Sequence, residues 1–465
     1  MHFPSTIGGI CLAVTSLTHA INVDVNTTQS LTTAAKAVAS RIVEIYSNTS
    51  TNIGLFPAPY YFWESGLTWD TLILYWALTG DSTYNDLVGE ALLSQMGSNN
   101  DFMPANQTKN EGNDDQAFWA LAAMTAAERG LPTPQEASAN VTWIQRAQTV
   151  FDEQVARWDD QSCGGGLRWQ IFPFNNGYDY KNALTNGNFA QLAARLGAFT
   201  GNATYTHWAM KTLQWSYDSG LISSSGAVYD GFSTTTNCSQ ANHIQWTASA
   251  GAYISAAASV MSATNAAPFW TTALNNLTSA IDLVFVQDGV LYESACAPGN
   301  YCSTDQLAFK SILLRALSMV QDLGTTDSTT NFNTTTPNSN NTSLAFITPL
   351  LRASAQAAAA ACSGGTSGKD CGSDWTTANY DNSTGLGQEL NALQAFLSNL
   401  PKKEVRNVNS TGGSMGTSGV SNGTGNGSSA GTSNGTQIYS SGAAGSLGVA
   451  IGMGVSLMFA CALLL

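Results

Sequence analysis

The chain has 465 residues and a formal net charge of −14, with 17 lysines and arginines against 31 aspartates and glutamates. Only 10% of its residues are charged, well below the roughly 25% of an average soluble domain. So few basic side chains offer no stripe to neutralise phosphates, which argues against nucleic-acid binding. Hydrophobic residues make up 43% and aromatic residues 10%, which excludes a wholly disordered chain.

The amino-terminal end has the pattern of a secretory signal. Residues 6–18 form a short apolar run, which leads into the segment Thr18-His19-Ala20 with its small residues. The run is too short to span a bilayer and is typical of a signal peptide cleaved after Ala20. Residues 1–20 are therefore expected to be removed, although no lysine or arginine precedes the run. A buried amino-terminal helix is the alternative.

The carboxy-terminal end predicts a GPI anchor. Residues 447–465 are apolar and uncharged, a polar spacer over 437–446 precedes them, and small residues occupy 434–436. This order of small residues, spacer and terminal apolar tail is the GPI-attachment signal. We expect attachment at Asn434, with Ser440, Ser441 and Gly442 as alternatives, and removal of residues 435–465. A tail-anchored helix is disfavoured, because such cytosolic proteins carry no signal peptide. The expected location is the outer face of the plasma membrane or the cell wall.

Residues 405–434 are rich in Ser, Gly, Thr and Asn and predict a flexible, glycosylated stalk. The folded domain is then expected over residues 21–404. About fifteen Asn-x-Ser/Thr sequons fit a glycosylated extracellular surface.

Cysteine usage also fits secretion. Six cysteines lie between the two processed ends, an even number that favours disulfides. Short loops would join Cys296 to Cys302 and Cys362 to Cys371, leaving Cys163 for Cys238, one of 15 arrangements for six cysteines. The sequence has no CxxC motif, and His207 and His243 are the only histidines after the signal peptide. Neither a metal nor a cofactor is expected.

Helical periodicity dominates the folded domain. Helices are expected near residues 31–47, 65–79, 82–96, 114–129, 135–158, 183–199, 203–218, 243–263, 267–283, 304–322, 342–361 and 385–399. Several of these patterns end in glycine, the usual residue after a helix, at Gly80, Gly130, Gly201 and Gly324. Strand-like alternation is limited to residues 166–172 and 284–292.

One short pattern occurs twice. The segment from Leu78 to Tyr84 resembles the segment from Phe199 to Tyr205, each with Thr-Gly at the end of one helix and a polar turn before the next. This repetition indicates a reused helical hairpin. Twelve helices in repeated hairpins predict an all-α fold, an (α/α)6 barrel with two concentric rings of six; a solenoid is the alternative.

A dense polar cluster surrounds two adjacent acids, Asp114 and Asp115. Asn113 is a suitable N-cap, which would place both acids in a first helical turn. Acids at that position often do no more than complement the helix dipole. As a functional pair, they match the two carboxyl groups that glycoside hydrolysis requires.

Aromatic and polar residues alternate elsewhere in the way that sugar sites use them, because sugars stack on rings and bond through hydroxyls. Three tryptophans beside polar groups at expected helix starts stand out: Trp69, Trp119 and Trp246. The full set of predicted substrate-binding residues is Trp69, Asp70, Trp119, Trp169, Lys181, Asn182, Asp230 and Trp246.

The chain resembles glycoside hydrolase family 76, the endo-α-1,6-mannanases, and especially its fungal GPI-anchored branch. The residues that carry the resemblance are Asn113–Trp119, Cys163–Gln170, Tyr180–Ala183, Ala193–Leu196, Asp230–Gly231, Asp305 and Phe309–Lys310. The resemblance implies an (α/α)6 barrel and a retaining mechanism, with Asp114 as nucleophile, Asp115 as general acid/base and Asp230 among the contacts to the −1 sugar. The chain departs from the family at Trp246–Gly251, where a Tyr and an Asn of the usual run are missing.

These expectations point to a retaining α-1,6-mannosidase of the fungal cell wall. The resemblance implies action on α-mannan or on the mannose of the GPI-core glycan, with transfer of anchored proteins to wall β-glucan as acceptor. A monomer is expected. One alternative is a non-catalytic mannan-binding or scaffolding protein on the same fold, although intact Asp114 and Asp115 argue against it. A lyase on an α/α toroid is a weaker alternative, because such lyases normally use a Tyr/His or Arg group and only His207 and His243 are available.

Overall fold

The computed structural model describes residues 21–49, 52–107, 109–134, 141–264, 268–326, 345–366 and 368–401. The expected signal peptide over 1–20, the stalk over 405–434 and the attachment signal over 435–465 lie outside these ranges. Among the helices in the described part, none is long and apolar enough to cross a membrane.

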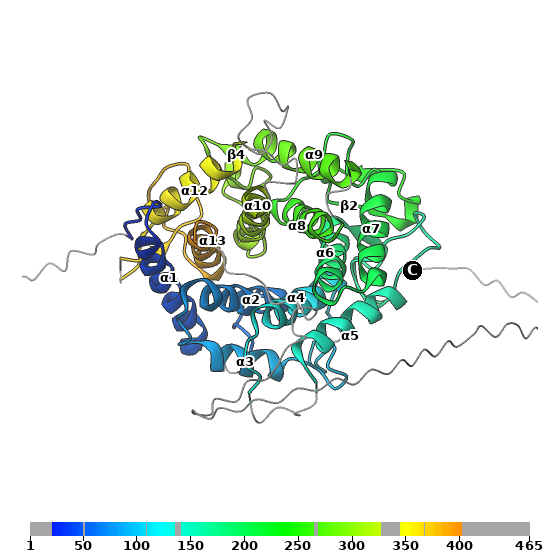
Figure 1. Cartoon of the computed structure of the whole chain (residues 1–465), viewed down its shortest axis with the longest axis horizontal. Coiled ribbons are helices and arrows are strands. Elements are labelled where there is room, and N and C mark those ends of the chain that lie inside the picture. Colours follow the sequence, from blue (N-terminus) through cyan, green and yellow to red (C-terminus); the bar gives the residue numbers. More distant parts are fainter. Residues whose placement is uncertain are drawn as a thin grey trace, which may run out of the picture. The chain divides into compact units, whose positions relative to one another are not determined.

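Twelve α-helices in the described ranges alternate along the chain between two concentric rings (Figure 1). The outer ring consists of α1 (Thr28–Thr49), α3 (Asn85–Ser94), α5 (Trp143–Ala156), α7 (Ala203–Asp218), α9 (Pro268–Val284) and α12 (Ile347–Ala361). The inner ring consists of α2 (Phe62–Thr79), α4 (Asn113–Arg129), α6 (Ala183–Thr200), α8 (Thr247–Ala263), α10 (Phe309–Thr326) and α13 (Leu386–Leu397).

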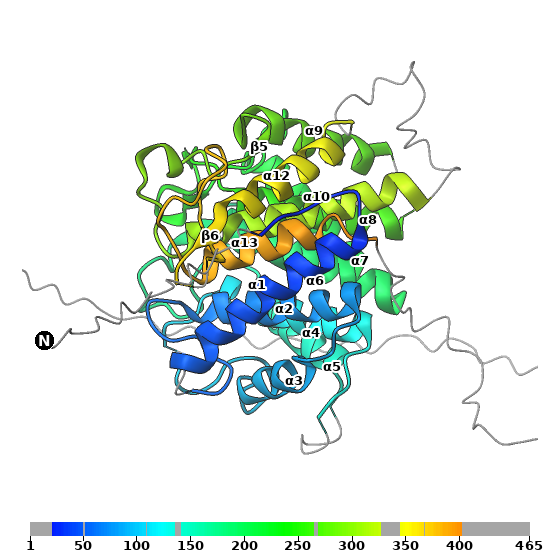
Figure 2. The same cartoon turned by 90° about the vertical axis from the view of Figure 1, so that its left-hand side faces the viewer.

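The inner ring closes on itself. Each inner helix packs against the next, from α2 through α4, α6, α8 and α10 to α13, and α13 packs back on α2. Figure 2 shows α1 and α12 running alongside α13, and both also contact it. The (α/α)6 barrel that the helical pattern predicts is therefore confirmed.

Glycine ends several of these helices as expected. Gly80, Gly130 and Gly201 follow α2, α4 and α6 with φ of 83°, 70° and 70°, a left-handed conformation that side chains disfavour. The prediction for Gly324 is wrong, because α10 continues to Thr326.

The two copies of the repeated hairpin form the same turn. Thr79 and Thr200 each accept a hydrogen bond through Oγ1 from the backbone N–H two residues on, at 3.1 and 3.2 Å. Asp81 and Asn202 repeat this arrangement with Thr83 and Thr204. The sequence echo therefore reflects one helix–turn–helix design used twice.

Strands are short and lie in the loops. β1 (Tyr180–Asn182), β2 (Gly231–Ser233) and β3 (Ala241–Asn242) form an antiparallel sheet in which Asn182 pairs with Gly231 and Gly231 with Asn242. β4 (Val286–Gln287) pairs with β5 (Val290–Leu291), and β6 (Cys362–Gly364) pairs with β7 (Asp370–Cys371). Short 3-10 helices are η1 (Thr234–Thr236), η2 (Ala297–Gly299) and η3 (Gln306–Ala308).

The expected strand at 284–292 is a hairpin turned at Asp288 and Gly289, both with positive φ. The expected strand at 166–172 is wrong apart from one bridge between Gln170 and Gly112, because positive φ at Gly165 and Gly166 turns the chain.

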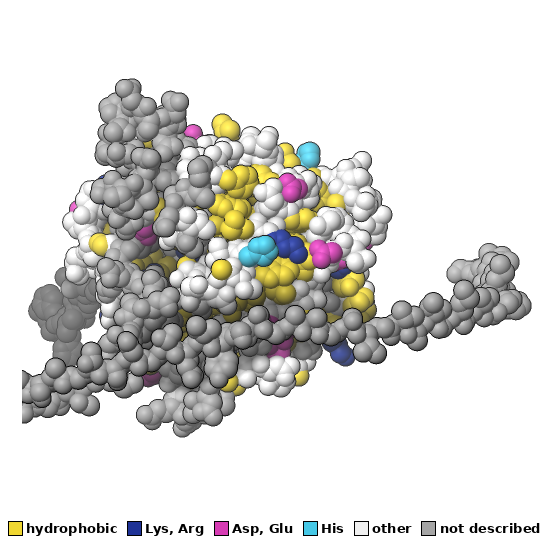
Figure 3. Space-filling model, turned by 45° about the vertical axis from the view of Figure 1, so that its right-hand side comes forward, with side chains coloured by type: hydrophobic (Ala, Val, Ile, Leu, Met, Phe, Trp, Pro, Cys, Tyr) yellow, Lys and Arg dark blue, Asp and Glu magenta, His cyan; other side chains and the backbone are white. Residues whose placement is uncertain are grey.

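Three disulfides link Cys163 to Cys238, Cys296 to Cys302 and Cys362 to Cys371, which confirms the favoured arrangement. On the face drawn in Figure 3, lysine and arginine side chains are few and scattered among uncharged ones. Where the side chains of that face are coloured, they form no basic stripe for nucleic acid.

Candidate active site

The paired acids lie where α4 begins. Gly112, rather than the expected Asn113, is the N-cap residue, with φ −89° and ψ 165°. Asn113 is the first helical residue, and its side-chain amide instead donates to the backbone oxygen of Arg168 at 2.9 Å. The backbone N–H of Gly112 donates to Oδ2 of Asp115 at 2.7 Å. Asp114 and Asp115 therefore occupy the first turn, as predicted.

The absence of a side chain at Gly112 lets the two acids converge. A Cβ there would lie 2.5 Å from Oδ1 of Asp114 and 3.0 Å from Oδ2 of Asp115. These two oxygens are therefore no more than about 5.5 Å apart, the sum of the two distances. Although adjacent helical residues point about 100° apart, both carboxyl groups lie close together at the amino-terminal end of α4.

Both acids line a cavity of about 960 Å³. Its walls come from the amino-terminal ends of five inner helices, α2, α4, α6, α8 and α10, and from the loops before them. Aromatic side chains dominate among its larger lining residues, which include Tyr60, Tyr61, Phe62, Trp63, Phe118, Trp169, Tyr180, Trp246 and Phe309. Such a mixture of rings and convergent polar groups suits a sugar.

Asp114 lies in an environment that stabilises its ionised form better than the environment of Asp115 does. Burial raises the pKa of Asp114 to about 6, while hydrogen bonds to the carboxylate limit the rise. Nδ2 of Asn182 donates to Oδ2 at 3.1 Å, and the backbone N–H of Asp115 donates to Oδ1 at 3.1 Å. Donors aimed at a carboxylate stabilise its charge, so Asp114 is suited to act as the anion.

The environment of Asp115 favours the protonated form. Burial raises the pKa of Asp115 well above its usual value, and the negative charges of Asp114 and Asp305 raise it further. The opposing influence is the single hydrogen bond from Gly112. Two carboxyl groups whose environments separate their pKa values are the arrangement that assigns one as base and the other as acid.

A second polar centre in the cavity wall is Asp230. Its carboxylate accepts hydrogen bonds from the Tyr180 hydroxyl at 2.6 Å, Nδ2 of Asn242 at 3.0 Å and Nε1 of Trp246 at 2.8 Å. These donors come from β1, β3 and the start of α8, so the three-stranded sheet and the inner ring both hold Asp230 in place.

The start of α8 is fixed by hydrogen bonds to the buried side chain of Glu293. Glu293 accepts the backbone N–H of Thr247 at 3.1 Å and also its hydroxyl. Because Trp246 immediately precedes Thr247, Glu293 fixes the backbone from which the indole reaches Asp230. Glu293 itself is buried.

Four of the predicted sugar-binding residues line the cavity: Trp169, Asn182, Asp230 and Trp246. The other four, Trp69, Asp70, Trp119 and Lys181, do not. Trp69 is fully buried and donates through Nε1 to the backbone oxygen of Gly54 at 2.8 Å. Asp70 forms a 2.5 Å ion pair with Arg315. Trp119 is fully buried and bonds the backbone oxygen of Phe62 at 3.1 Å.

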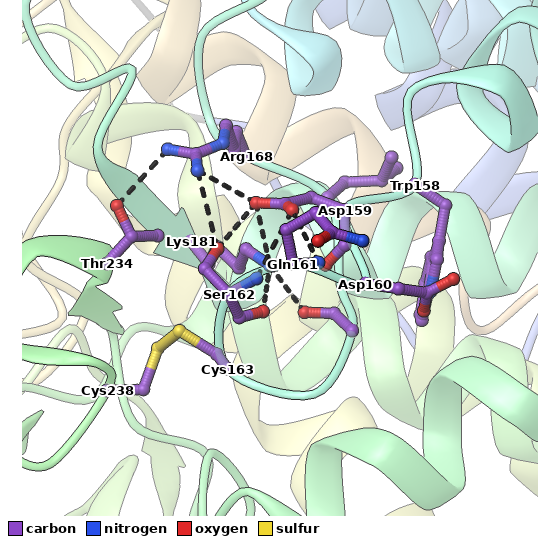
Figure 4. Close-up of polar contacts among 12 residues, drawn as sticks. Trp158, Asp159, Asp160, Gln161, Ser162, Cys163, Arg168, Lys181, Thr234 and Cys238 are labelled. Atoms are coloured by element: carbon purple, nitrogen blue, oxygen red, sulfur yellow. Dashed lines mark hydrogen bonds and ion pairs between the residues drawn. A yellow bond between two sulfur atoms is a disulfide. The ribbon is translucent and has the colours of Figure 1, made fainter. Parts of the chain in front are cut away.

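Lys181 is a structural residue on the buried side of β1. Successive strand residues face opposite ways, and Lys181 is buried between Tyr180 and Asn182, which line the cavity. Its ammonium contacts Asp159 and donates to three backbone oxygens, including that of Gly165 at 2.6 Å (Figure 4). Arg168 also pairs with Asp159, at 2.8 Å. This cluster holds the loop before Trp169.

The predicted site omitted several lining residues. Trp63, Glu111 and Asp305 line the cavity, and Asp305 accepts the indole N–H of Trp63 at 2.9 Å. The run of aromatics from Tyr60 to Trp63 is a sequence signal that could have located this wall. Among the described residues, no group of three or more His, Cys, Asp or Glu side chains is placed to hold a metal ion.

Comparison with known proteins gives consistent results. The model of glycosyl hydrolase family 76 matches residues 30–411. The mannan endo-1,6-alpha-mannosidase DCW1 of Saccharomyces cerevisiae is 39% identical over 390 residues, covering 83% of this chain and 82% of that protein. A putative mannan endo-1,6-alpha-mannosidase of Schizosaccharomyces pombe is 38% identical, with 86% and 88% covered.

Solved structures share the fold. The crystal structure of Dfg5 from Chaetomium thermophilum in complex with glucosamine is 34% identical, covers 84% of this chain and 96% of its own, and superposes with a TM-score of 0.73. An inactive variant of the α-1,6-mannanase GH76A of Salegentibacter sp. HEL1_6, in complex with α-1,6-mannotriose, is 19% identical with a TM-score of 0.62 and covers 79% of this chain and 98% of its own. At that identity the likeness concerns the fold.

Proposed function

This chain belongs to glycosyl hydrolase family 76 and is a glycosidase, and we propose that it cleaves α-1,6-linked mannose with retention of configuration. The observation that carries the proposal is the convergence of Asp114 and Asp115 over Gly112. Retaining glycosidases hold their two carboxyl groups about 5–5.5 Å apart, whereas inverting enzymes need about 6.5–9.5 Å to admit a water. The limit of 5.5 Å between the facing oxygens supports retention.

In the first step, the carboxylate of Asp114 attacks the anomeric carbon of the −1 mannose. Asp115 donates its proton to the glycosidic oxygen as the bond to the leaving sugar breaks. A covalent mannosyl–Asp114 ester results. Asp115, now a carboxylate, then removes a proton from an incoming hydroxyl, whose oxygen attacks the anomeric carbon and releases Asp114.

The proposed donor is α-mannan or the mannose of a GPI-core glycan. Two similar fungal proteins are named as mannan endo-1,6-alpha-mannosidases, one of them as putative, and similar Dfg5 was crystallised with glucosamine. The hydrogen-bonded carboxylate of Asp230, with Trp246 beside it, is suited to hold hydroxyls of the −1 sugar. Ser249 lines the cavity near the point where the chain departs from the usual family run.

We further propose transfer to a β-glucan acceptor in fungal cell-wall biogenesis. The nucleophile and the acid line a cavity with many aromatic side chains, on which an acceptor sugar can stack so that its hydroxyl competes with water for the ester. With a signal peptide before residue 21 and a GPI anchor attached near Asn434, the enzyme would act as a monomer at the outer face of the plasma membrane or in the wall.

The test follows the first product formed by the purified full chain from an α-1,6-mannobioside, using NMR to read its anomeric configuration. Retained product supports the mechanism, and inverted product contradicts it. Repeating the reaction with added β-glucan oligosaccharide should give a mannosylated acceptor. If none forms, the enzyme is a hydrolase. If no α-1,6-mannoside is cleaved, while mannose oligomers still bind, the non-catalytic binding protein becomes the better interpretation.

A further inference from the structure

The loop between Trp169 and Tyr178 displays aromatic rings to solvent. Phe172 and Phe174 stack on each other, with ring centroids 5.4 Å apart and ring planes at 13°. Phe174 is 70% exposed, and Trp169, which lines the cavity, is 37% exposed. Single exposed aromatic side chains are common, but several together beside a cavity indicate a binding surface.

This loop is fixed to the wall of the cavity. Nδ2 of Asn175 donates to Oε1 of Gln170 at 3.1 Å, and Gln170 lines the cavity. The backbone N–H of Asn175 also donates to the backbone oxygen of Phe172 at 3.0 Å, which closes a turn that contains both phenylalanines. A Cβ at Gly177 would lie 2.3 Å from the ring of Trp169, so the backbone packs directly against that indole. The rings are therefore held in place before a ligand binds, which lowers the entropic cost of binding.

The loop borders the side of the cavity that holds the donor sugar. The backbone N–H of Trp169 donates to the backbone oxygen of Tyr180 at 2.7 Å. The hydroxyl of Tyr180 in turn donates to Asp230, the proposed contact to the −1 sugar. A donor chain that extends beyond its −1 unit on this side therefore leaves the cavity next to Phe172 and Phe174.

The chemistry of the loop favours a neutral partner. The segment from Trp169 to Tyr178 contains no charged residue, and the whole chain has a net charge of −14. Arg168, which contacts the ring of Tyr178, is already paired with Asp159. An anionic lipid surface or a nucleic acid would need free basic side chains beside the rings. Sugar rings are uncharged and have apolar faces that stack on aromatic side chains, so a neutral polysaccharide chain fits better.

We infer that Phe174, supported by Phe172, forms a platform on which a mannose unit of the donor chain stacks, beyond the −1 unit and outside the cavity. This inference rests on the proposed cleavage of α-mannan and adds a determinant of chain length to it. One face of the Phe174 ring packs on Phe172, and the exposed face can contact the apolar face of a sugar. Long mannan chains then bind more tightly than short ones, while the reacting groups stay the same.

The test compares the binding of α-1,6-mannobiose and α-1,6-mannohexaose to the full chain by titration calorimetry. Asp115→Asn is present in every sample, so that neither ligand is cleaved. We expect the hexaose to bind about tenfold more tightly than the biose, because only the hexaose extends to the platform. Adding Phe174→Ala should weaken hexaose binding about three- to tenfold, the effect of losing one ring contact, and should leave biose binding unchanged. Phe174→Trp, which keeps a ring, should preserve the tight binding of the hexaose.

Phe269→Ala is the matched control. Phe269 lies on α9, is 49% exposed and also contacts a neighbouring ring, that of Trp270, but it does not line the cavity. Its removal should leave the binding of both oligomers unchanged. Equal affinity of the Asp115→Asn protein for the two oligomers, or tight hexaose binding that survives Phe174→Ala, would overturn the inference.

A membrane contact is the competing explanation of the exposed rings. Sedimentation of the unmodified chain with phosphatidylcholine vesicles tests this explanation. If the chain binds the vesicles and Phe174→Ala abolishes that binding while the hexaose preference is unaffected, the loop serves a bilayer and the inference is wrong. Turnover of an α-1,6-mannobioside by the unmodified chain tests the glycosidase proposal separately, because a substrate of two units does not extend to the platform.

Discussion

Asn182 connects the start of one inner helix to the nucleophile on another. Its Nδ2 donates to Oδ2 of Asp114 at 3.1 Å, while its Oδ1 accepts the backbone N–H of Thr185 and so caps α6. One side chain thus stabilises a helix and orients a catalytic carboxylate. The two roles can be separated by experiment.

Asn182→Ala should lower activity beyond its effect on stability. Loss of the amide removes a donor that favours the charged carboxylate, so the pKa of Asp114 should rise and the acidic limb of the rate profile should move to higher pH. We expect kcat/KM to fall about 10- to 100-fold, and the lost cap to cost about 1 kcal/mol of unfolding free energy. Steady-state kinetics over a pH series and urea unfolding measure the two effects.

Asn202→Ala is the matched control, because Asn202 caps α7 in the same way, through Oδ1 to the backbone N–H of Thr204 at 3.0 Å. Asn202 is exposed and does not line the cavity. The Asn202→Ala variant should lose a similar unfolding free energy, and its pH–rate profile should not change. If the pH dependence of kcat/KM is also unchanged in Asn182→Ala, a catalytic role for the amide is refuted.

Gly112→Ala should damage catalysis while preserving the fold. The backbone of Gly112 has φ −89°, which alanine adopts without strain. Its added Cβ, however, would meet Oδ1 of Asp114 at 2.5 Å and push the carboxylates from their positions. Displacements of about 1 Å at a reacting group cost on the order of 100-fold in rate. Kinetics with an α-1,6-mannobioside, beside a thermal melt that matches the unmodified protein, would check this; nearly full activity would contradict the convergence argument.

The pH dependence of the rate should report both acids. Activity should rise with pH as Asp114 loses its proton near pH 6 and fall at higher pH as Asp115 loses its own. Because the charge of Asp305 raises the pKa of Asp115, Asp305→Asn should move the descending limb to lower pH. The exposed variant Asp288→Asn should not move it. A descending limb that is identical in all three proteins would exclude Asp305 as an influence on the acid.

Helix periodicity predicted the barrel well because the inner helices are buried over most of their length and several helices end at a glycine that sequence alone identifies. The boundaries were less accurate, and that error affected the site. The expected helix at 65–79 begins at Phe62, so Trp69 and Asp70 lie about two turns inside it. At about 1.5 Å per residue, they are roughly 10 Å along the helix axis from its start, whereas Trp63 lies in the first turn and lines the cavity.

The other errors in the predicted site concern the side to which a strand residue points and contacts between residues far apart in the sequence. Lys181 adjoins two cavity residues in sequence, but the alternation of a strand turns it to the opposite side. Asp305 is far from Trp63 in the sequence, and only closure of the inner ring brings the two into contact. Local patterns indicate which face a side chain takes only when the element and its boundary are known, and they carry no information about contacts across the ring.

The stability of the protein should be greatest in mildly acidic solution. Burial raises the pKa of Glu389 and of Glu64 to about 8, from an ordinary value of 4.5. A carboxyl group with a raised pKa in the folded state stabilises that state below its unfolded pKa, and the contribution is lost as pH rises toward the folded pKa. Both groups therefore predict a decline in unfolding free energy between about pH 4.5 and pH 8.

Glu389→Gln should flatten this decline. Oε1 of Glu389 accepts the backbone N–H of Cys371 at 2.9 Å, which the side-chain oxygen of glutamine can also do, and Oε2 is buried with no hydrogen-bond partner among the described residues. The variant should match the unmodified chain near pH 5 and exceed it by on the order of 1 kcal/mol near pH 8. Urea unfolding at both values measures this. Glu90→Gln, an exposed substitution of the same charge on α3, should change little at either pH; if it flattens the decline as much as Glu389→Gln, overall net charge rather than the buried carboxyl group is the cause.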